Sequence, residues 1–346
     1  MISRTRALIF ICAVSTCLVA SLLPWPVRAQ SEQEFFKGKT LTLVIGSASG
    51  GGYDTLGRIV AKHLTDHLPI NAGIIVRNMP GAGSIVATNY LYNVASKDGL
   101  TIGLVQNNTP FEPLMGTKQA EYDVSKFNWL GSPSVETGVL AVWHTVPVNS
   151  IADVENHEIT VGSPGAQSTP SFYARLLNET LGAKLKIIVG YPGQAETSLA
   201  MQRGEVDGYL FFYSSLMATQ SAWVKDGSLK LLVQYGQKKE PALGDVPFAS
   251  DLVKTAQDRL LLQAGFAAIS VGRPFVAPPD VPVDRVAALR TALAATFADP
   301  QFIAEANAAN LGINEPTTGA QLAEFIAATY RTPSVILDKL RRLYSQ

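Results

Sequence analysis

The sequence predicts an α/β fold of two lobes, each with a largely parallel sheet covered by helices. Three observations lead to this prediction. From residue 39 onward, short runs of β-branched residues alternate with helical stretches. About 320 residues remain once an N-terminal leader is removed, which is enough for two domains. Glycine-rich loops join several of the expected strands to the helices that follow them.

The order of the elements follows from the spacing of apolar residues. Strands are expected where β-branched or apolar residues fill a short run between turn signals, at 40–45, 74–77, 101–105, 139–143, 159–162, 186–189, 208–212, 230–234 and 266–271. Helices are expected at 54–67, 84–94, 171–181, 195–202, 283–298, 301–310 and 320–328, with one more toward the C-terminus. Asp54 is expected to cap the first helix, because its carboxylate can accept hydrogen bonds from the helix start.

The chain is expected to leave one lobe, build a second and then return. A crossing is suggested near 131–137, and a polar, turn-rich stretch at 237–247 suggests the return. The first lobe would then comprise 30–137 and 240–346. The second lobe would be an insertion spanning 138–239.

The first 29 residues have the parts of a secretory signal. Arg4 and Arg6 precede the uncharged run 7–23, and small residues ending at Ala29 suit a signal peptidase. We therefore expect a leader, residues 1–29, that is cleaved after Ala29, and a periplasmic product. A retained membrane anchor is the alternative, although the apolar run is at the short limit for a bilayer. Both cysteines, Cys12 and Cys17, lie in the leader, so no disulfide or thiol chemistry is expected in the mature chain.

Composition narrows the classes of partner. The chain has 28 basic and 28 acidic residues, and the leader holds three arginines, so the mature form carries a net charge of about −3. Nucleic acid is not expected as a partner, because its recognition usually shows as a basic stripe. No other uncharged run reaches membrane-spanning length, so we expect a soluble mature protein.

The loop after the first expected strand has the composition of an anion cradle. It consists of Ser47, Ala48, Ser49, Gly50, Gly51, Gly52, Tyr53 and Asp54. Its glycines bring bare amide groups toward a ligand, and the helix that follows adds the positive end of its dipole. An ordinary strand-to-helix turn is the alternative. The loop lacks the Gly-Lys-Ser/Thr of a phosphate-binding P-loop.

Two more loops have the same character. One spans 78–84 and contains Gly83; the other spans 162–169 and contains Ser163, Gly165, Ser168 and Thr169. Because ligands of open α/β sheets bind at the carboxyl ends of strands, these loops are expected to converge on one cleft. Tyr191, in another glycine-containing loop, offers an apolar face with a polar tip, and Asn108 completes the candidate ligand-binding residues.

Signals of catalysis or of a metal are weak by comparison. His63 and His67 are spaced i, i+4 on an expected helix, but the glutamate of a His-Glu-x-x-His motif is missing between them. The sequence also has no Gly-x-Ser-x-Gly nucleophile elbow. We therefore expect no metal, no cofactor and no catalytic residue.

Further motifs complete a resemblance to a known family. Besides the three loops, they are Lys97-Asp98-Gly99, Tyr191-Pro192-Gly193, Arg203-Gly204-Glu205-Val206-Asp207, Leu243-Gly244-Asp245-Val246-Pro247, Ala277-Pro278-Pro279 and Ala298-Asp299-Pro300. Together they resemble the periplasmic receptors of tripartite tricarboxylate transporters, the TctC-like proteins. This resemblance implies a class II periplasmic-binding-protein (Venus-flytrap) fold that closes on a carboxylate held by loop amides, hydroxyls and bridging waters.

By position, the resemblance implies a first-lobe clamp at 47–54 and a second-lobe clamp formed by Ser163, Gly165, Ser168 and Thr169. Many members have Pro-Phe in place of Gly46-Ser47, a histidine in place of Ser171, and an acidic or amide residue near Ala200. Since these departures lie at or near the ligand loops, a tricarboxylate is not implied as the ligand.

The expected function is that of a monomeric, cofactor-free receptor that captures a small organic carboxylate and delivers it to membrane transporter subunits. An exported α/β hydrolase or transferase that uses the same loops on a small organic acid is the main alternative. A receptor that delivers its ligand to a sensor domain is the second.

Overall fold

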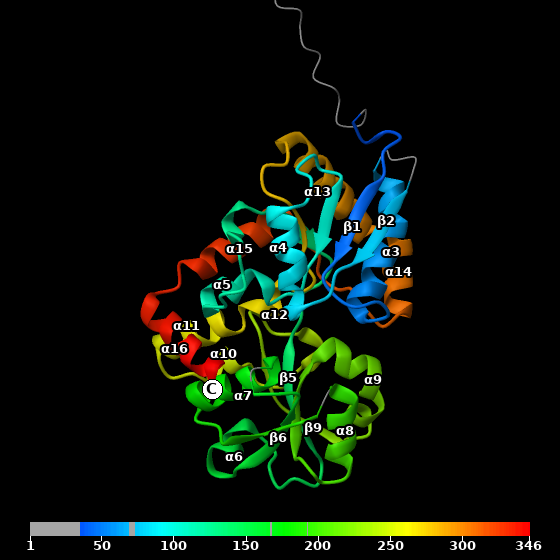
Figure 1. The fold of residues 1–346 in the computed structure, drawn as a ribbon. Helices are drawn as coiled ribbons and strands as arrows, with labels where there is room; N and C mark the ends of the chain where they lie inside the picture. Colours follow the sequence, from blue (N-terminus) through cyan, green and yellow to red (C-terminus); the bar gives the residue numbers. More distant parts are fainter. Residues whose placement is uncertain (1–34, 69–72, 167, 192) are drawn as a thin grey trace, which may run out of the picture.

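Two separate sheets organise the molecule (Figure 1). The computed structural model describes residues 35–68, 73–166, 168–191 and 193–346. The strands are β1 (Leu41–Ile45), β2 (Ile74–Asn78), β3 (Thr101–Leu104), β4 (Asn128–Ser132), β5 (Gly138–Trp143), β6 (Ile159–Ser163), β7 (Leu185–Val189), β8 (Gly208–Phe212), β9 (Leu229–Tyr235), β10 (Phe275–Ala277) and β11 (Thr317–Thr318).

The longer helices cover these sheets. They are α3 (Gly52–His67), α4 (Ile85–Asn93), α5 (Glu112–Met115), α6 (Ile151–Asn156), α7 (Thr169–Leu181), α8 (Gln194–Gln202), α9 (Tyr213–Lys225), α10 (Ala249–Leu252), α11 (Ala256–Gly265), α12 (Ala267–Val271), α13 (Val283–Ala298), α14 (Pro300–Ala308), α15 (Gly319–Tyr330) and α16 (Ser334–Ser345). Among the described residues, no helix is both long and apolar enough to cross a membrane.

The first sheet has the strand order β11-β4-β10-β3-β1-β2. β1 pairs in parallel with β2 and β3, while β10 runs antiparallel between β3 and β4. The helices α3, α13 and α14 pack together over a core that includes Leu43, Leu289 and Phe302. Because β1, β2 and β3 are parallel, their carboxyl ends and the loops that follow them lie along one edge of this sheet.

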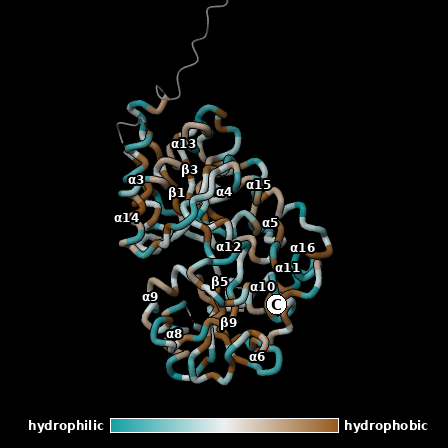
Figure 2. The backbone as a smooth tube through the Cα atoms, turned by 180° about the vertical axis from the view of Figure 1, so that it is seen from behind, coloured by the Kyte–Doolittle hydropathy of each residue, from teal (hydrophilic) through white to brown (hydrophobic). Residues whose placement is uncertain are grey.

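The second sheet has the order β7-β6-β8-β5-β9. β5 is antiparallel to both β8 and β9, and β6 is parallel to β7 and β8. An aromatic group of Tyr173, Tyr235 and Phe266 joins α7, β9 and the end of α11, with ring centroids 4.7 to 5.6 Å apart. In Figure 2 hydrophobic stretches follow inner strands such as β1 and β9, and hydrophilic ones gather in outer turns.

Eight of the nine expected strands are present with small shifts at their ends, and the expected helices are present as well. The strand expected at 266–271 is wrong, because this segment forms α12 directly after α11. Phe266, Ile269 and Val271 are completely buried. A short apolar run does not distinguish a buried helix from a buried strand, which explains the error.

Asp54 is not the cap of its helix, since α3 begins at Gly52 and its N-cap is Gly51. The strands of the second sheet all lie between Gly138 and Tyr235, as an inserted lobe requires. However, α10, α11 and α16, which come later in the chain, pack against α7. The division into 30–137 with 240–346 and 138–239 therefore stays a proposal, and the leader cleavage after Ala29 lies outside the described residues.

Candidate functional site

The loop after β1 is held in shape by a buried carboxylate. Asp54 accepts hydrogen bonds from the Gly50 amide at 2.8 Å, Asn78 Nδ2 at 2.9 Å and Arg58 Nε at 3.0 Å. The hydrogen bond from Arg58, followed by those from Gly50 and Asn78, lowers the pKa of Asp54 to about 2. Gly50 has φ +86°, a left-handed conformation that favours glycine. Asp54 thus organises the loop, and direct contact of its carboxylate with a ligand stays a prediction.

This arrangement leaves donors at the start of α3. The first hydrogen bond within the helix runs from the Thr55 amide to the Gly51 carbonyl, so the amides of Gly52, Tyr53 and Asp54 precede the helical ladder. The stretch from Ala48 to Gly52 is exposed. The positive end of the helix dipole therefore faces solvent beside free amides, as an anion site requires.

The loop after β2 has an unusual backbone. Four consecutive residues have positive φ: Gly81 (137°), Ala82 (45°), Gly83 (59°) and Ser84 (79°). Two of them are not glycine, and such strained backbone is often found at ligand sites. Ser84 is fully buried against Gly46, where an added Cβ would lie 1.5 Å from Ser84 Oγ. Only glycine at position 46 permits this contact between the first two loops.

The loop after β3 contacts the loops after β1 and β2. The Asn107 amide donates a hydrogen bond to Tyr53 Oη at 3.3 Å, and a Cβ added at Gly83 would lie 3.5 Å from Asn108 Nδ2. Burial raises the pKa of Tyr53 to about 12, so its hydroxyl keeps its proton. Asn108 Nδ2 donates to Glu112 Oε1 at 2.7 Å, which fixes the orientation of the amide.

Three buried oxygens at these strand ends lack a hydrogen-bond partner among the described residues. They are Ser47 Oγ after β1, Ser84 Oγ after β2 and Asn108 Oδ1 after β3. Buried polar groups in native proteins are nearly always paired, so each such group calls for an explanation such as water or a ligand. The sequence predicted Ser47 and Asn108, but it gave Ser84 no role beyond its place at the helix start.

In the second lobe, the predicted hydroxyls bond to one another. The Oγ atoms of Ser168 and Ser171 each lie 2.7 Å from the carbonyl oxygen of Gly165, and Ser163 Oγ lies 2.6 Å from Ser168 Oγ. Ser171 Oγ also donates to Ser163 Oγ at 2.7 Å. Thr169 begins α7 directly after this serine cluster. The serine at 171, where related receptors are expected to have histidine, thus completes the internal network of the loop.

Tyr191 lies beside this cluster. Its amide donates to the Ser163 carbonyl at 3.2 Å, and its ring lies against Gly162, where an added Cβ would be 3.3 Å from Tyr191 Cδ2. The side chain is half-buried. The structure therefore places Tyr191 next to Ser163, and the two loops that contain them are neighbours in the second lobe.

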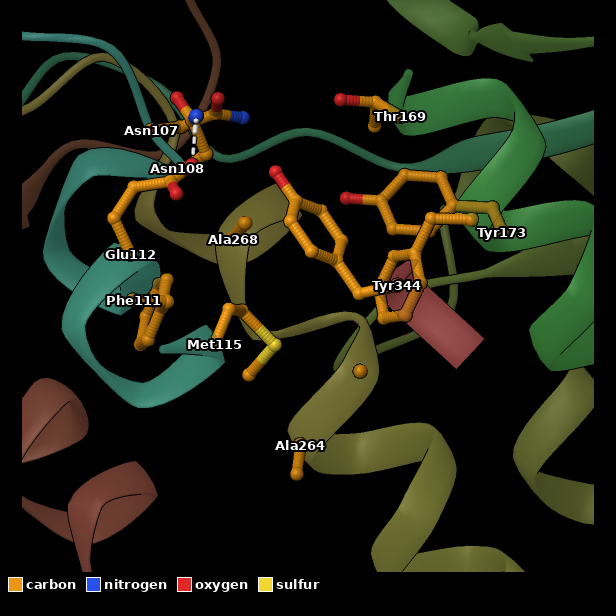
Figure 3. Close-up of a pocket in the computed structure, with 12 residues that line it drawn as sticks. Asn107, Asn108, Phe111, Glu112, Met115, Thr169, Tyr173, Ala264, Ala268 and Tyr344 are labelled. Atoms are coloured by element: carbon orange, nitrogen blue, oxygen red, sulfur yellow. Dashed lines mark hydrogen bonds between the residues drawn. The ribbon is translucent and has the colours of Figure 1, made fainter. Parts of the chain in front are cut away.

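A cavity of about 60 Å³ lies where both lobes meet the C-terminal helix, and it is lined by Asn108 and Thr169 from the predicted set (Figure 3). Its wall also includes Glu112, Tyr173 and Tyr344, which sequence reasoning missed. The remaining predicted residues lie outside its lining. Tyr344 is two residues from the C-terminus, and no sequence signal points to it.

The histidine pair does not form a shared site. His63 Nε2 lies 2.8 Å from Glu305, while His67 Nε2 lies 3.2 Å from Asp299, so each ring faces a different carboxylate of α14 or its cap. Within the described ranges, no group of three or more potential metal ligands occurs.

Comparison with known proteins assigns the chain to a family. The model of the tripartite tricarboxylate transporter family receptor (TctC) matches residues 56–341. The "UPF0065 protein in gbd 5'region" of Cupriavidus necator is 27% identical over 252 residues, which are 70% of this chain and 72% of that protein.

Solved structures share the fold. A TctC solute binding protein from Polaromonas superposes with a TM-score of 0.70 at 21% identity, over 88% of this chain and 98% of that one. MatC from Rhodopseudomonas palustris with bound malate gives 0.60 at 19% identity, over 88% and 98%. The described structure is thus a two-lobed periplasmic-binding-protein fold, and the chain belongs to the receptor family of tripartite tricarboxylate transporters.

Proposed function

We propose that this receptor captures a small organic carboxylate between its lobes and delivers it to the membrane subunits of its transporter. The observation that carries the proposal is the set of free amides at the exposed start of α3, with the unpartnered hydroxyl of Ser47 in the loop that leads into it. Hydroxyl and amide donors clustered at a helix N-terminus reward a negative charge. The malate bound by the R. palustris relative is in keeping with a carboxylate.

The proposed ligand contacts come from both lobes. In the first lobe they are residues 47–54 with Gly83 and Asn108, and in the second lobe Ser163, Gly165, Ser168, Thr169 and Tyr191. Closure of the lobes would bring the two sets onto one ligand. Because the hydroxyls of Ser163 and Ser168 already have partners, the second lobe would bind the anion through amides and through rearranged hydroxyls.

The remaining parts of the proposal concern the protein as a whole. The mature form would begin at Gln30 in the periplasm and act as a monomer. It would bind its ligand without transforming it. An exported hydrolase or transferase is the competing hypothesis, and it predicts that a bound acid is recovered as a product.

The test uses the mature protein, a panel of small carboxylic acids and the neutral amide of each acid. A bound acid at about 100 times its dissociation constant should raise the free energy of unfolding by about 2.7 kcal/mol, and the matching amide should not. Ser47→Ala should weaken binding at least about tenfold, whereas Ser96→Ala, in an exposed loop, should leave it unchanged.

Mass spectrometry of the recovered ligand separates the two hypotheses. Unchanged acid supports the receptor, and a product supports the enzyme. Stabilisation by sugars or nucleotides but by no acid would exclude the carboxylate assignment.

A further inference from the structure

The cavity at the C-terminal helix continues the proposed ligand site. Asn108 lines both this cavity and the neighbouring hollow that contains Ala82 and Gly83. On the opposite side, Thr169 places the start of α7 in the same wall. A ligand whose carboxylate is held by the strand-end loops would therefore extend its other end toward this space.

The body of the cavity is apolar and aromatic. Phe111, Met115, Phe172 and Tyr344 contribute to its wall, and the rings of Phe172 and Tyr344 meet edge to face with centroids 5.5 Å apart. In Figure 3 the hydroxyls of Tyr173 and Tyr344 point into the same space, across from Asn107 and Asn108. Such a wall suits an apolar body with a polar end.

The helix that supplies Tyr344 is fixed to both lobes. Arg341 Nε donates to the Leu114 carbonyl of α5 at 2.8 Å, and Arg175 of α7 donates to the Leu343 carbonyl at 3.3 Å. Both guanidinium groups are thus bonded to helix backbone, and neither residue lines the cavity. These hydrogen bonds therefore fix the position of Tyr344 in the cavity wall.

The charge of the cavity is one-sided. Glu112 is its carboxylate, buried to 6% exposure, and none of the lining residues is lysine, arginine or histidine; Lys118 lines the neighbouring hollow, which Glu112 also borders. Glu112 accepts hydrogen bonds from Asn108 Nδ2 at 2.7 Å and from Thr117 Oγ1 at 2.5 Å. Asn108 Oδ1 beside it is a buried acceptor without a partner among the described residues. This end of the site thus needs a donor and repels an anion.

We propose that the ligand carries a single carboxylate, an apolar body that fills the cavity and a hydrogen-bond donor at its far end, and that Glu112 excludes dicarboxylates. This inference rests on the proposed function, because it assumes that the first carboxylate sits at the loop after β1, and it assigns Asn108 to the other end of the ligand. Glu112 and Asn108 would then select the chemical group at the second end of the ligand.

The experiment measures dissociation constants by calorimetry for two matched pairs, benzoate with terephthalate and hexanoate with adipate. Each monocarboxylate should bind at least about tenfold more tightly than its dicarboxylate, since like charges in a poorly solvated site repel strongly. 4-Hydroxybenzoate should bind more tightly than benzoate, because its hydroxyl can donate to Asn108 Oδ1.

Glu112→Gln keeps the size of the side chain and removes its charge, so it should reduce the preference for monocarboxylates at least about threefold. Glu324→Gln, exposed on α15, is the matched control and should keep the preference. Terephthalate and adipate that bind wild type as tightly as their partners would overturn the inference and leave the proposed function standing. An unchanged preference in folded Glu112→Gln would also overturn it. If no carboxylate binds wild type, the proposed function fails together with the inference.

Discussion

The carboxylate of Asp54 should stabilise the folded receptor in a pH-dependent way. Its pKa is lowered from 3.8 to about 2, which corresponds to about 2.5 kcal/mol. The Asp54 side chain is 5% exposed but Arg58 is 50% exposed. Solvent screening at Arg58 therefore reduces our expected contribution to about 1 to 2 kcal/mol. Asp54→Asn should lose this amount at neutral pH.

The sign of the pH dependence follows from the direction of the shift. Because the pKa is lower in the folded state, the contribution is present above about pH 4 and is lost as the pH falls toward 2. Urea unfolding of wild type and Asp54→Asn at pH 7, 5, 4 and 3 measures the difference. Asp66→Asn, exposed on the same helix, is the control and should change stability by less than about 0.5 kcal/mol. A difference for Asp54→Asn that stays constant from pH 7 to pH 3 would refute the reasoning.

Three substitutions test the loops, one through ligand affinity and two through the stability of the fold. Gly51→Val should preserve the melting temperature, because Gly51 has φ −87° and an added Cβ would lie 3.9 Å from the nearest heavy atom. The same variant should weaken acid binding at least about tenfold in calorimetry. Normal affinity would contradict this prediction. Gly46→Ala should destabilise the fold by about 1 to 3 kcal/mol in urea unfolding, since its Cβ would meet Ser84 Oγ; wild-type stability would contradict it. Ser171→Ala removes a buried hydrogen bond to Ser163 Oγ and should cost about 1 kcal/mol by thermal unfolding, whereas an unchanged melting temperature would count against the network.

Much of the fold could be predicted because the strands obey local rules. Runs such as Leu41–Ile45 are apolar, β-branched and bounded by turn signals, so their type follows from the sequence itself. β10 could not be found in this way, since Phe275–Ala277 has only three residues and gains its identity by pairing with β3 and β4. The strand expected at 266–271 was wrong for another reason, because a short apolar run does not distinguish a buried helix from a buried strand.

The position of the candidate site could be predicted where it depends on the path of the backbone. Glycine-rich loops after parallel strands lie at one sheet edge by topology, so Ser47, Gly83 and Asn108 could be placed near one another without a structure. Contacts between residues far apart in the sequence could not be predicted. Ser84 is important because it meets Gly46, and Tyr344 because α16 returns to α5 and α7, and neither contact leaves a local signal.

The two ends of the proposed site differ in how they recognise a ligand. A carboxylate held by amides at a helix N-terminus is recognised by groups that every residue possesses, so this end of the site constrains the ligand only to being an anion. The side chains that could distinguish one acid from another, Glu112, Tyr173 and Tyr344, come from three separate helices and line the far end of the cavity. Membership of the receptor family therefore bears mainly on the anionic end of the ligand. The other end of the proposed ligand faces side chains that tertiary contacts bring together, and Glu112 is the charged one among them.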